Sequence, residues 1–198
     1  MTAPSFTRIA FLSAALACAV LAVDEAKAQR DPPVLPADLA TYCQAVACRQ
    51  NSVVQVRLPD GRIQEERSTI YRPAIVRNSV SILLGEEVRA VPEFDDDQLQ
   101  GWRAAERRES ARTPVLTFKL AQETGGDLAV SLVISNSGRE PVKLRLSIRT
   151  AGSASAEYTS SCPVLAGGTV YEYWTQPVVE VVVREATVPT DESALMCD

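Results

Sequence analysis

The chain has 198 residues, a formal net charge of −5 and no histidine. A mildly acidic chain lacks the basic field that attracts nucleic acid or anionic lipid, so we expect no nucleic-acid partner. The lack of histidine excludes Ser-His-Asp and Cys-His catalysis and His-ligated metal centres. The sequence also lacks a P-loop, a G-x-G-x-x-G motif and a G-x-S-x-G motif, so no cofactor is expected. An enzyme would have to rely on carboxylates, Lys, Tyr or a bound cation.

Residues 1–28 have the residue order of a cleavable secretory signal peptide. One cation, Arg8, precedes an apolar run from Ile9 to Val23. Small residues at Ala26 and Ala28 then offer an A-x-A cleavage site. The apolar run is shorter than the roughly 20 residues of a spanning helix. We therefore predict a periplasmic or secreted protein with no membrane span after cleavage.

Two alternatives to a cleaved signal stay open. The apolar run could be retained as a membrane anchor, or Cys18, preceded by Leu16-Ala17, could carry a lipid as in a bacterial lipoprotein signal. Cleavage after Ala28 would leave residues 29–198, the usual size of one domain. We predict a single domain there, ending in a tail at 187–198.

Cysteine usage agrees with export. Without Cys18, the mature chain keeps four cysteines, and an even number in an exported chain indicates two disulfides. Of the three possible pairings we favour Cys43 with Cys48, because a short loop is easily closed, and Cys162 with Cys197, because this bond would fix the C-terminal tail. A zinc site is not expected, since the C-x4-C pair has no second ligand pair at typical spacing.

The mature chain begins with a proline-rich, extended segment at 29–36, followed by a predicted short helix at 37–49. A disulfide between Cys43 and Cys48 requires this helix to end between them. Beyond the predicted helix, apolar and polar residues alternate with a period of two. Val53–Leu58 and Ile63 onward flank a Pro-Asp-Gly turn, which predicts a β-hairpin.

The middle of the chain has a less regular pattern. We predict strands at Ala74–Val76, Val80–Leu84 and Glu87–Val91. The next segment, 95–111, is rich in Ala, Glu and Arg but contains Gly101. It fits a loop or a short helix, with a strand near Leu99–Arg103 as an alternative.

The C-terminal half has the clearest alternation. We predict strands at Val115–Gln122, Leu128–Ile134, Val142–Ile148, Thr169–Trp174 and Val178–Ala186, with the second and third of these forming a long hairpin. Many short strands with frequent turns are typical of an antiparallel sandwich or barrel. The predicted fold is mostly β: an antiparallel β-sandwich, Ig-like or jelly-roll-like, with a short N-terminal helix.

Several short motifs carry a resemblance that covers most of residues 40–188. They are the Cys43/Cys48 pair, Gly85-Glu86, Ser160-Ser161-Cys162-Pro163-Val164, Glu172-Tyr173-Trp174 and Gln176-Pro177. With these motifs the chain resembles a group of small exported proteins of proteobacteria with Ig-like sandwich character and no assigned activity. The resemblance implies a Gram-negative periplasm.

Two groups of residues are candidate binding surfaces. Asp95, Asp96 and Asp97 follow Glu93-Phe94 and could bind Ca²⁺, but they lack EF-hand spacing, and a solvated loop is the alternative. Tyr171 and Tyr173 share one face of a strand and Trp174 lies on the other. Exposed aromatic residues would form a binding hot spot; packing in the core or over a sheet edge is the alternative.

The leading functional hypothesis is a non-catalytic exported binding or structural module of the cell envelope, whose partner is another protein or a glycan. An inhibitor of an envelope hydrolase belongs to the same class. The competing hypothesis is a carboxylate-based envelope hydrolase, with an acid pair drawn from Glu86, Glu87 and Asp95–Asp97.

Overall fold

Antiparallel strands dominate the computed structural model. It describes residue 43 and residues 48–69, 72–95, 97–109, 113–124, 128–191 and 195–197, and all of these belong to the unit Pro32–Asp198. The predicted signal peptide, the proline-rich segment and most of the predicted helix lie outside the described residues. The strands of the described part are β1 Cys48–Arg49, β2 Ser52–Arg57, β3 Ile63–Ser68, β4 Arg72–Pro73, β5 Ile75–Val76, β6 Ser79–Leu83, β7 Glu87–Asp95, β8 Gln98–Ala104, β9 Leu116–Gln122, β10 Val130–Asn136, β11 Lys143–Thr150, β12 Glu157–Ser160, β13 Thr169–Trp174 and β14 Val178–Thr187.

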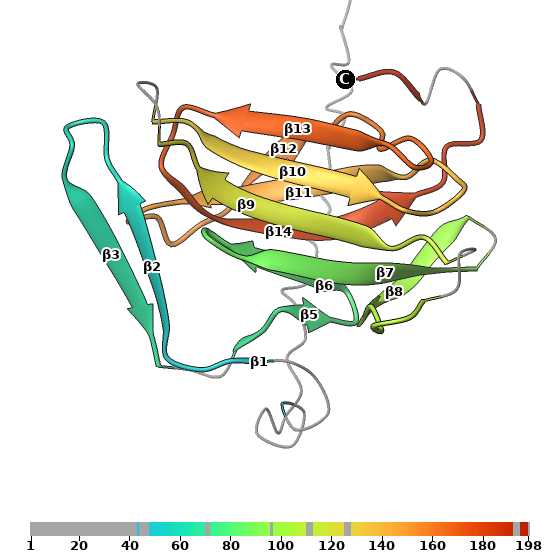
Figure 1. Ribbon diagram of the computed structural model, residues 1–198, viewed down its shortest axis with the longest axis horizontal. Helices are drawn as coiled ribbons and strands as arrows, with labels where there is room; N and C mark the ends of the chain where they lie inside the picture. Colours follow the sequence, from blue (N-terminus) through green and yellow to red (C-terminus); the bar gives the residue numbers. More distant parts are fainter. Residues whose placement is uncertain are drawn as a thin grey trace, which may run out of the picture. The chain divides into compact units, whose positions relative to one another are not determined.

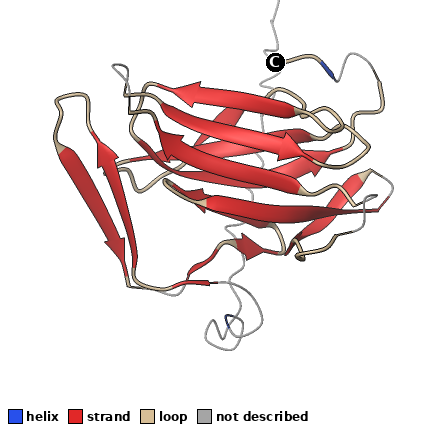
Figure 2. Cartoon of the chain, viewed as in Figure 1, coloured by secondary structure: helices blue, strands red, loops and turns tan. Residues whose placement is uncertain are grey.

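Most of these strands form two layers that face each other. One layer has the order β8-β7-β9-β10-β13, and the other contains β12-β11-β14 with β6 and β5 added beside β14. Figure 1 shows β13, β10, β9 and β7 in front of β12, β11, β14 and β6, and Figure 2 shows that strands and loops make up nearly all of the described chain. The layers join through one residue pair, Thr187 of β14 with Gln98 of β8. The predicted β-sandwich is confirmed.

The core lies between the layers because alternate residues of each strand are apolar. In β9, Leu116, Phe118 and Leu120 are fully buried, whereas Lys119 between them is exposed. The ring of Phe118 meets Trp102 of β8 edge to face, with 6.4 Å between the centroids. Besides Trp102 and Phe118, the leucines and isoleucines buried in this core are Ile75, Ile82, Leu116, Leu120, Leu132, Ile134, Leu144, Leu146 and Ile148.

Strand β14 has neighbours along both edges. It pairs with β11 over its whole length and with β6 through Glu180–Val183. Two register shifts against β11 insert extra residues into β14, and such bulges turn the following side chain to the other face. As a result, Val178 and Val181 lie in the main core, while Val179 packs into a second cluster outside it.

That second cluster positions the β2–β3 hairpin. Val54 and Val56 of β2 are buried against Leu83 and Val179. The turn is closed by the bond from the Leu58 amide to the Arg62 carbonyl, and Gly61 takes a φ of 84° that favours glycine. The predicted hairpin around the Pro-Asp-Gly turn is confirmed.

One strand pairing predicted from the sequence is wrong. β10 and β11 do not form a hairpin, because β10 pairs with β9 and β13 while β11 pairs with β12 and β14. The chain crosses between layers after Asn136, whose buried side-chain amide donates to the carbonyls of Glu140 and Val164. These bonds hold the crossing, so the two alternating runs face each other across the core.

One boundary also differs from the sequence prediction. Cys48 and Arg49 are not helical; they pair as β1 with Arg72–Pro73 of β4. In the segment 95–111 the structure agrees with the alternative of a strand near Leu99–Arg103, because Gln98–Ala104 forms β8 against β7. Gly101 is accommodated because its missing side chain allows close approach: a Cβ there would lie 3.1 Å from the carbonyl oxygen of Arg77.

Truncation of Phe118 tests the core. We expect Phe118→Ala to lower the free energy of unfolding by about 3–5 kcal/mol, because a fully buried aromatic side chain is lost and a cavity remains. Lys119→Ala, on the exposed face of the same strand, is the matched control and should change it little. Urea unfolding measures both; equal effects would contradict the assigned faces.

Candidate functional site

Tyr171 and Tyr173 form an exposed aromatic pair on β13. Their side chains are 58% and 61% exposed, and the rings are nearly parallel, with centroids 6.5 Å apart and 10° between the planes. Within the described residues β13 pairs only with β10, so it is the edge strand of its layer. The pair therefore stands on the outer face of the sandwich at an open edge, and we call Tyr171 and Tyr173 the tyrosine pair.

Trp174 has a different role from the two tyrosines. It lies on the inward side of β13 together with Val170, and both pack against the main core while remaining half-buried. Its alternation with the tyrosines follows from the period of two along a strand. Trp174 thus anchors β13 from within and leaves the tyrosine pair as the outward surface.

The acidic residues lie at the opposite edge of the same layer. Asp95 ends β7 and Asp97 is in the turn to β8, whereas Asp96 lies outside the described residues. Since β7 and β8 lie at one edge of the layer and β13 at the other, the predicted aspartates and aromatics do not form one site. Asp97 instead borders a hollow of about 500 Å³, which Arg77 and Arg184 also line.

Metal-ligating side chains do not gather in the part of the chain that the structure describes, where no group of three or more His, Cys, Asp or Glu residues is found.

The acid pair suggested for a hydrolase is not assembled from Glu87 and Asp95. These residues lie at the two ends of β7, so the strand rise places them about 26 Å apart, against roughly 5–9.5 Å for glycosidase carboxylates. Glu86 is engaged elsewhere: it forms an ion pair with Arg49 and accepts a hydrogen bond from the Leu83 amide.

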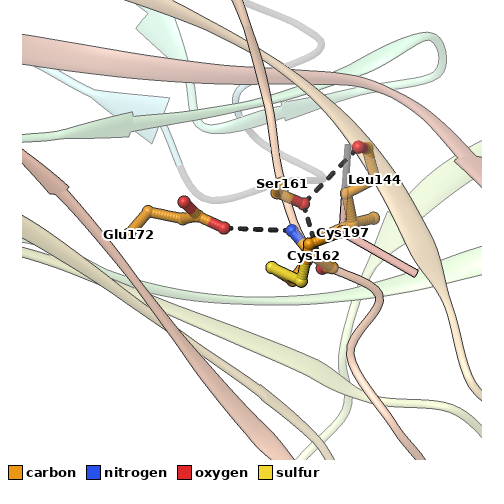
Figure 3. The surroundings of a disulfide bond; sticks show 5 residues. All are labelled: Leu144, Ser161, Cys162, Glu172 and Cys197. Carbon is orange, nitrogen blue, oxygen red and sulfur yellow. Dashed lines mark hydrogen bonds between the residues drawn. A yellow bond between two sulfur atoms is a disulfide. The ribbon is translucent and has the colours of Figure 1, made fainter. Parts of the chain in front are cut away.

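Both favoured disulfides are present. Cys43 bonds to Cys48, and Cys162 bonds to Cys197, which attaches the C-terminal tail to the loop between β12 and β13. Figure 3 shows the second disulfide beside Glu172 of β13, whose carboxylate accepts a 3.2 Å hydrogen bond from the Cys162 amide. Disulfides persist in oxidising compartments, so the protein belongs to a non-cytoplasmic location.

Glu172 is half-buried next to this disulfide. Burial raises the pKa of its carboxyl above the ordinary value, and the hydrogen bond from the Cys162 amide opposes that shift only in part. In the folded protein Glu172 therefore holds its proton to higher pH than a solvated glutamate does.

A buried carboxylate on β14 was not anticipated from the sequence. Glu180 is 1% exposed, and its oxygens accept hydrogen bonds from Arg72 at 2.7 Å, Ser81 at 2.7 Å and Arg149 at 3.0 Å. Arg149 also bonds Glu66 of β3. We call Glu180, Arg72, Ser81, Arg149 and Glu66 the Glu180 network.

The Glu180 network joins five strands, β3, β4, β6, β11 and β14, on the outer face of the β14 layer. Burial alone would raise the pKa of the Glu180 carboxyl, but the Ser81 hydrogen bond and the charges of Arg72 and Arg149 outweigh burial and hold the pKa below its ordinary value. The sequence carries one signal for this group, a single glutamate within the apolar run Val178–Val183. Its arginine partners could not be identified from that signal.

Comparison of the chain with protein-family models, curated proteins and solved structures gave no significant match. No helix among the described residues is long and apolar enough to cross a membrane. A function for this chain therefore has to be inferred from the chemistry of its own surfaces.

Removal of the Glu180 carboxylate tests the network. We expect Glu180→Ala to lower the free energy of unfolding at pH 7 by about 1–3 kcal/mol, because Ser81 and Arg72 lose the acceptor that they share, while Arg149 keeps Glu66 as a partner. The folded-state pKa is depressed, so the loss should shrink as pH falls below about 4.3, the ordinary glutamate value. Urea unfolding at pH 7 and pH 3 measures this; Glu65→Ala, at an exposed ion pair, should have a much smaller effect.

Glu172 gives the opposite pH dependence. Its raised folded-state pKa means that its contribution to stability is full below the ordinary glutamate pKa and is lost as pH rises through the folded value. Glu172→Gln stays neutral and keeps a carbonyl that can accept from Cys162. We expect the variant to melt at a higher temperature than the wild type at pH 7 and at a similar temperature at pH 3. A lower melting temperature at pH 7 would refute this assignment.

Proposed function

We propose that this chain is a non-catalytic binding module of the cell envelope, and that it contacts its partner through the tyrosine pair. The observation that carries the proposal is the exposure of two parallel tyrosine rings on an open edge strand. Tyrosine supplies a large contact area at low entropic cost and is enriched in binding hot spots. A second layer and Trp174 hold the strand from behind, which keeps the rings in place before a partner arrives.

The compartment is part of the same proposal. The two disulfides support an oxidising location, and the residue order of 1–28 favours export through a cleaved signal peptide. We propose a periplasmic or secreted protein, with lipid attachment at Cys18 as the alternative. The partner would then be another envelope protein or a glycan, and inhibition of an envelope hydrolase would be one outcome of such binding.

A carboxylate hydrolase is less well supported by the geometry. The separation of Glu87 from Asp95 along β7 leaves that pair too far apart to act on one bond. The tyrosine pair, by contrast, needs no further group to act as a contact surface.

A paired capture experiment tests the proposal. Wild-type protein and Tyr171→Ala/Tyr173→Ala are immobilised and exposed to the same envelope extract. We expect the double variant to retain at least tenfold less of any component that the wild type enriches, because truncation of two hot-spot tyrosines costs about 2 kcal/mol or more.

Tyr158→Ala is the matched control, because Tyr158 is equally exposed but lies on β12 in the other layer, where the guanidinium of Arg145 on the neighbouring strand β11 lies over its ring. It should bind as the wild type does. Equal capture by the wild type and the double variant, with both proteins folded, would overturn the proposal.

A further inference from the structure

The outer face of the β14 layer contains a hollow that differs in chemistry from the tyrosine pair. Its volume is about 240 Å³, and its lining comes from β4, β5, β6, β11, β14 and the 154–156 turn. The ionic lining residues are Arg72, Arg149 and Arg184 with Glu180. Three cations therefore surround one carboxylate, although the whole chain carries a net charge of −5.

Arg184 distinguishes this hollow from an ordinary ion-pair network. It is half-buried, yet it makes no ion pair or side-chain hydrogen bond with any described residue. The other half-buried arginines in the described part of the chain each have a carboxylate partner; they are Arg49, Arg72, Arg103 and Arg149. A partly desolvated guanidinium without an anion is unfavourable, so Arg184 offers an unused positive charge.

Ser79 adds a second unused group to the same lining. It is only 5% exposed and lies on the outward side of β6, since Val80 and Ile82 point into the core. Ser81, two residues on, donates to Glu180, whereas the Ser79 hydroxyl has no hydrogen-bond partner among the described residues. Among the described residues, the buried polar side-chain atom without a partner is Trp102 Nε1 and not the Ser79 hydroxyl, so this hydroxyl is open to the hollow, where a ligand atom can bond to it.

The charges of the lining favour an anion. Glu180 is shared by Arg72 and Arg149, and Arg149 is further neutralised by Glu66 outside the hollow. Arg184 is then the cation without a carboxylate partner. Arg72, whose side chain is 42% exposed, can also present its remaining N–H groups to a ligand. Guanidinium groups bind carboxylate and phosphate oxygens through paired, charge-assisted hydrogen bonds.

We propose that this hollow is a binding site for an oxyanion, a phosphate or carboxylate group of a small ligand, held by Arg184 and Arg72 with the Ser79 hydroxyl as a further donor. The site does not depend on the proposed role of the tyrosine pair, because the two lie on the outer faces of different layers.

Titration with inorganic phosphate tests the site. The side-chain Nε–H resonances of the arginines are followed by NMR at constant ionic strength, so that general screening is the same throughout. We expect a saturable shift of the Arg184 resonance, and at least tenfold weaker phosphate binding in Arg184→Ala, because one charge-assisted contact contributes about that factor. A parallel titration with acetate separates the two ligand chemistries; saturation by either anion supports the site.

Arg139→Ala is the control for loss of one positive charge, since Arg139 is exposed in the turn after β10 and lies outside the hollow. It should bind phosphate as the wild type does. Ser79→Ala should weaken binding to a smaller degree than Arg184→Ala. Shifts that grow linearly with both anions, or equal binding by Arg184→Ala and Arg139→Ala, would overturn the proposal.

Discussion

The structure depends on burying β14 on both of its faces. This strand pairs with β11 along one edge and with β6 and β8 along the other, so it takes part in both layers. Its inward-facing valines pack in the core. The bulges turn Val179 outward into the second cluster, against which the β2–β3 hairpin packs. Every backbone N–H and C=O group of such a buried strand needs a hydrogen-bond partner. The buried carboxylate of Glu180 also needs partners, and the arginines of the Glu180 network supply them.

The Glu180 network links β14 to strands on the outer face of its layer. Arg72 and Arg149 approach one carboxylate from strands that are 108 and 31 residues away in sequence. Through Glu66 the network also reaches the hairpin. Polar contacts therefore fasten β3 and β4 to the outer face of the layer, where apolar burial is sparse. The same arrangement leaves Arg184 beside the network without a carboxylate of its own.

Alternation in the sequence predicted most strands because it reports which residues point the same way. It does not report which strands lie side by side. Alternation alone therefore predicts one hairpin for residues 128–134 and 142–148, although the bonds of Asn136 direct them into separate layers. It does not predict β12, because Glu157 and Tyr158 are both exposed and the strand has no apolar alternation.

For the same reason, alternation in the sequence predicts the candidate surfaces only in part. Alternation separated Tyr171 and Tyr173 from Trp174, but it could not say which side faced solvent; the packing of Trp174 against the main core decides that. Arg184 and Ser79 carried no signal in sequence, since their lack of partners is visible only when distant strands are assembled. The cysteine pairing was predictable because one loop is short and the other bond fixes a chain end.

The role of β14 as the strand that joins both layers can be measured directly by native-state hydrogen exchange. We predict that the amides of Val181 and Val183 are among the slowest to exchange, and that they open with the free energy of global unfolding. Faster exchange of these amides through a partial opening, while β9 and β10 remain protected, would show that β14 does not have this role.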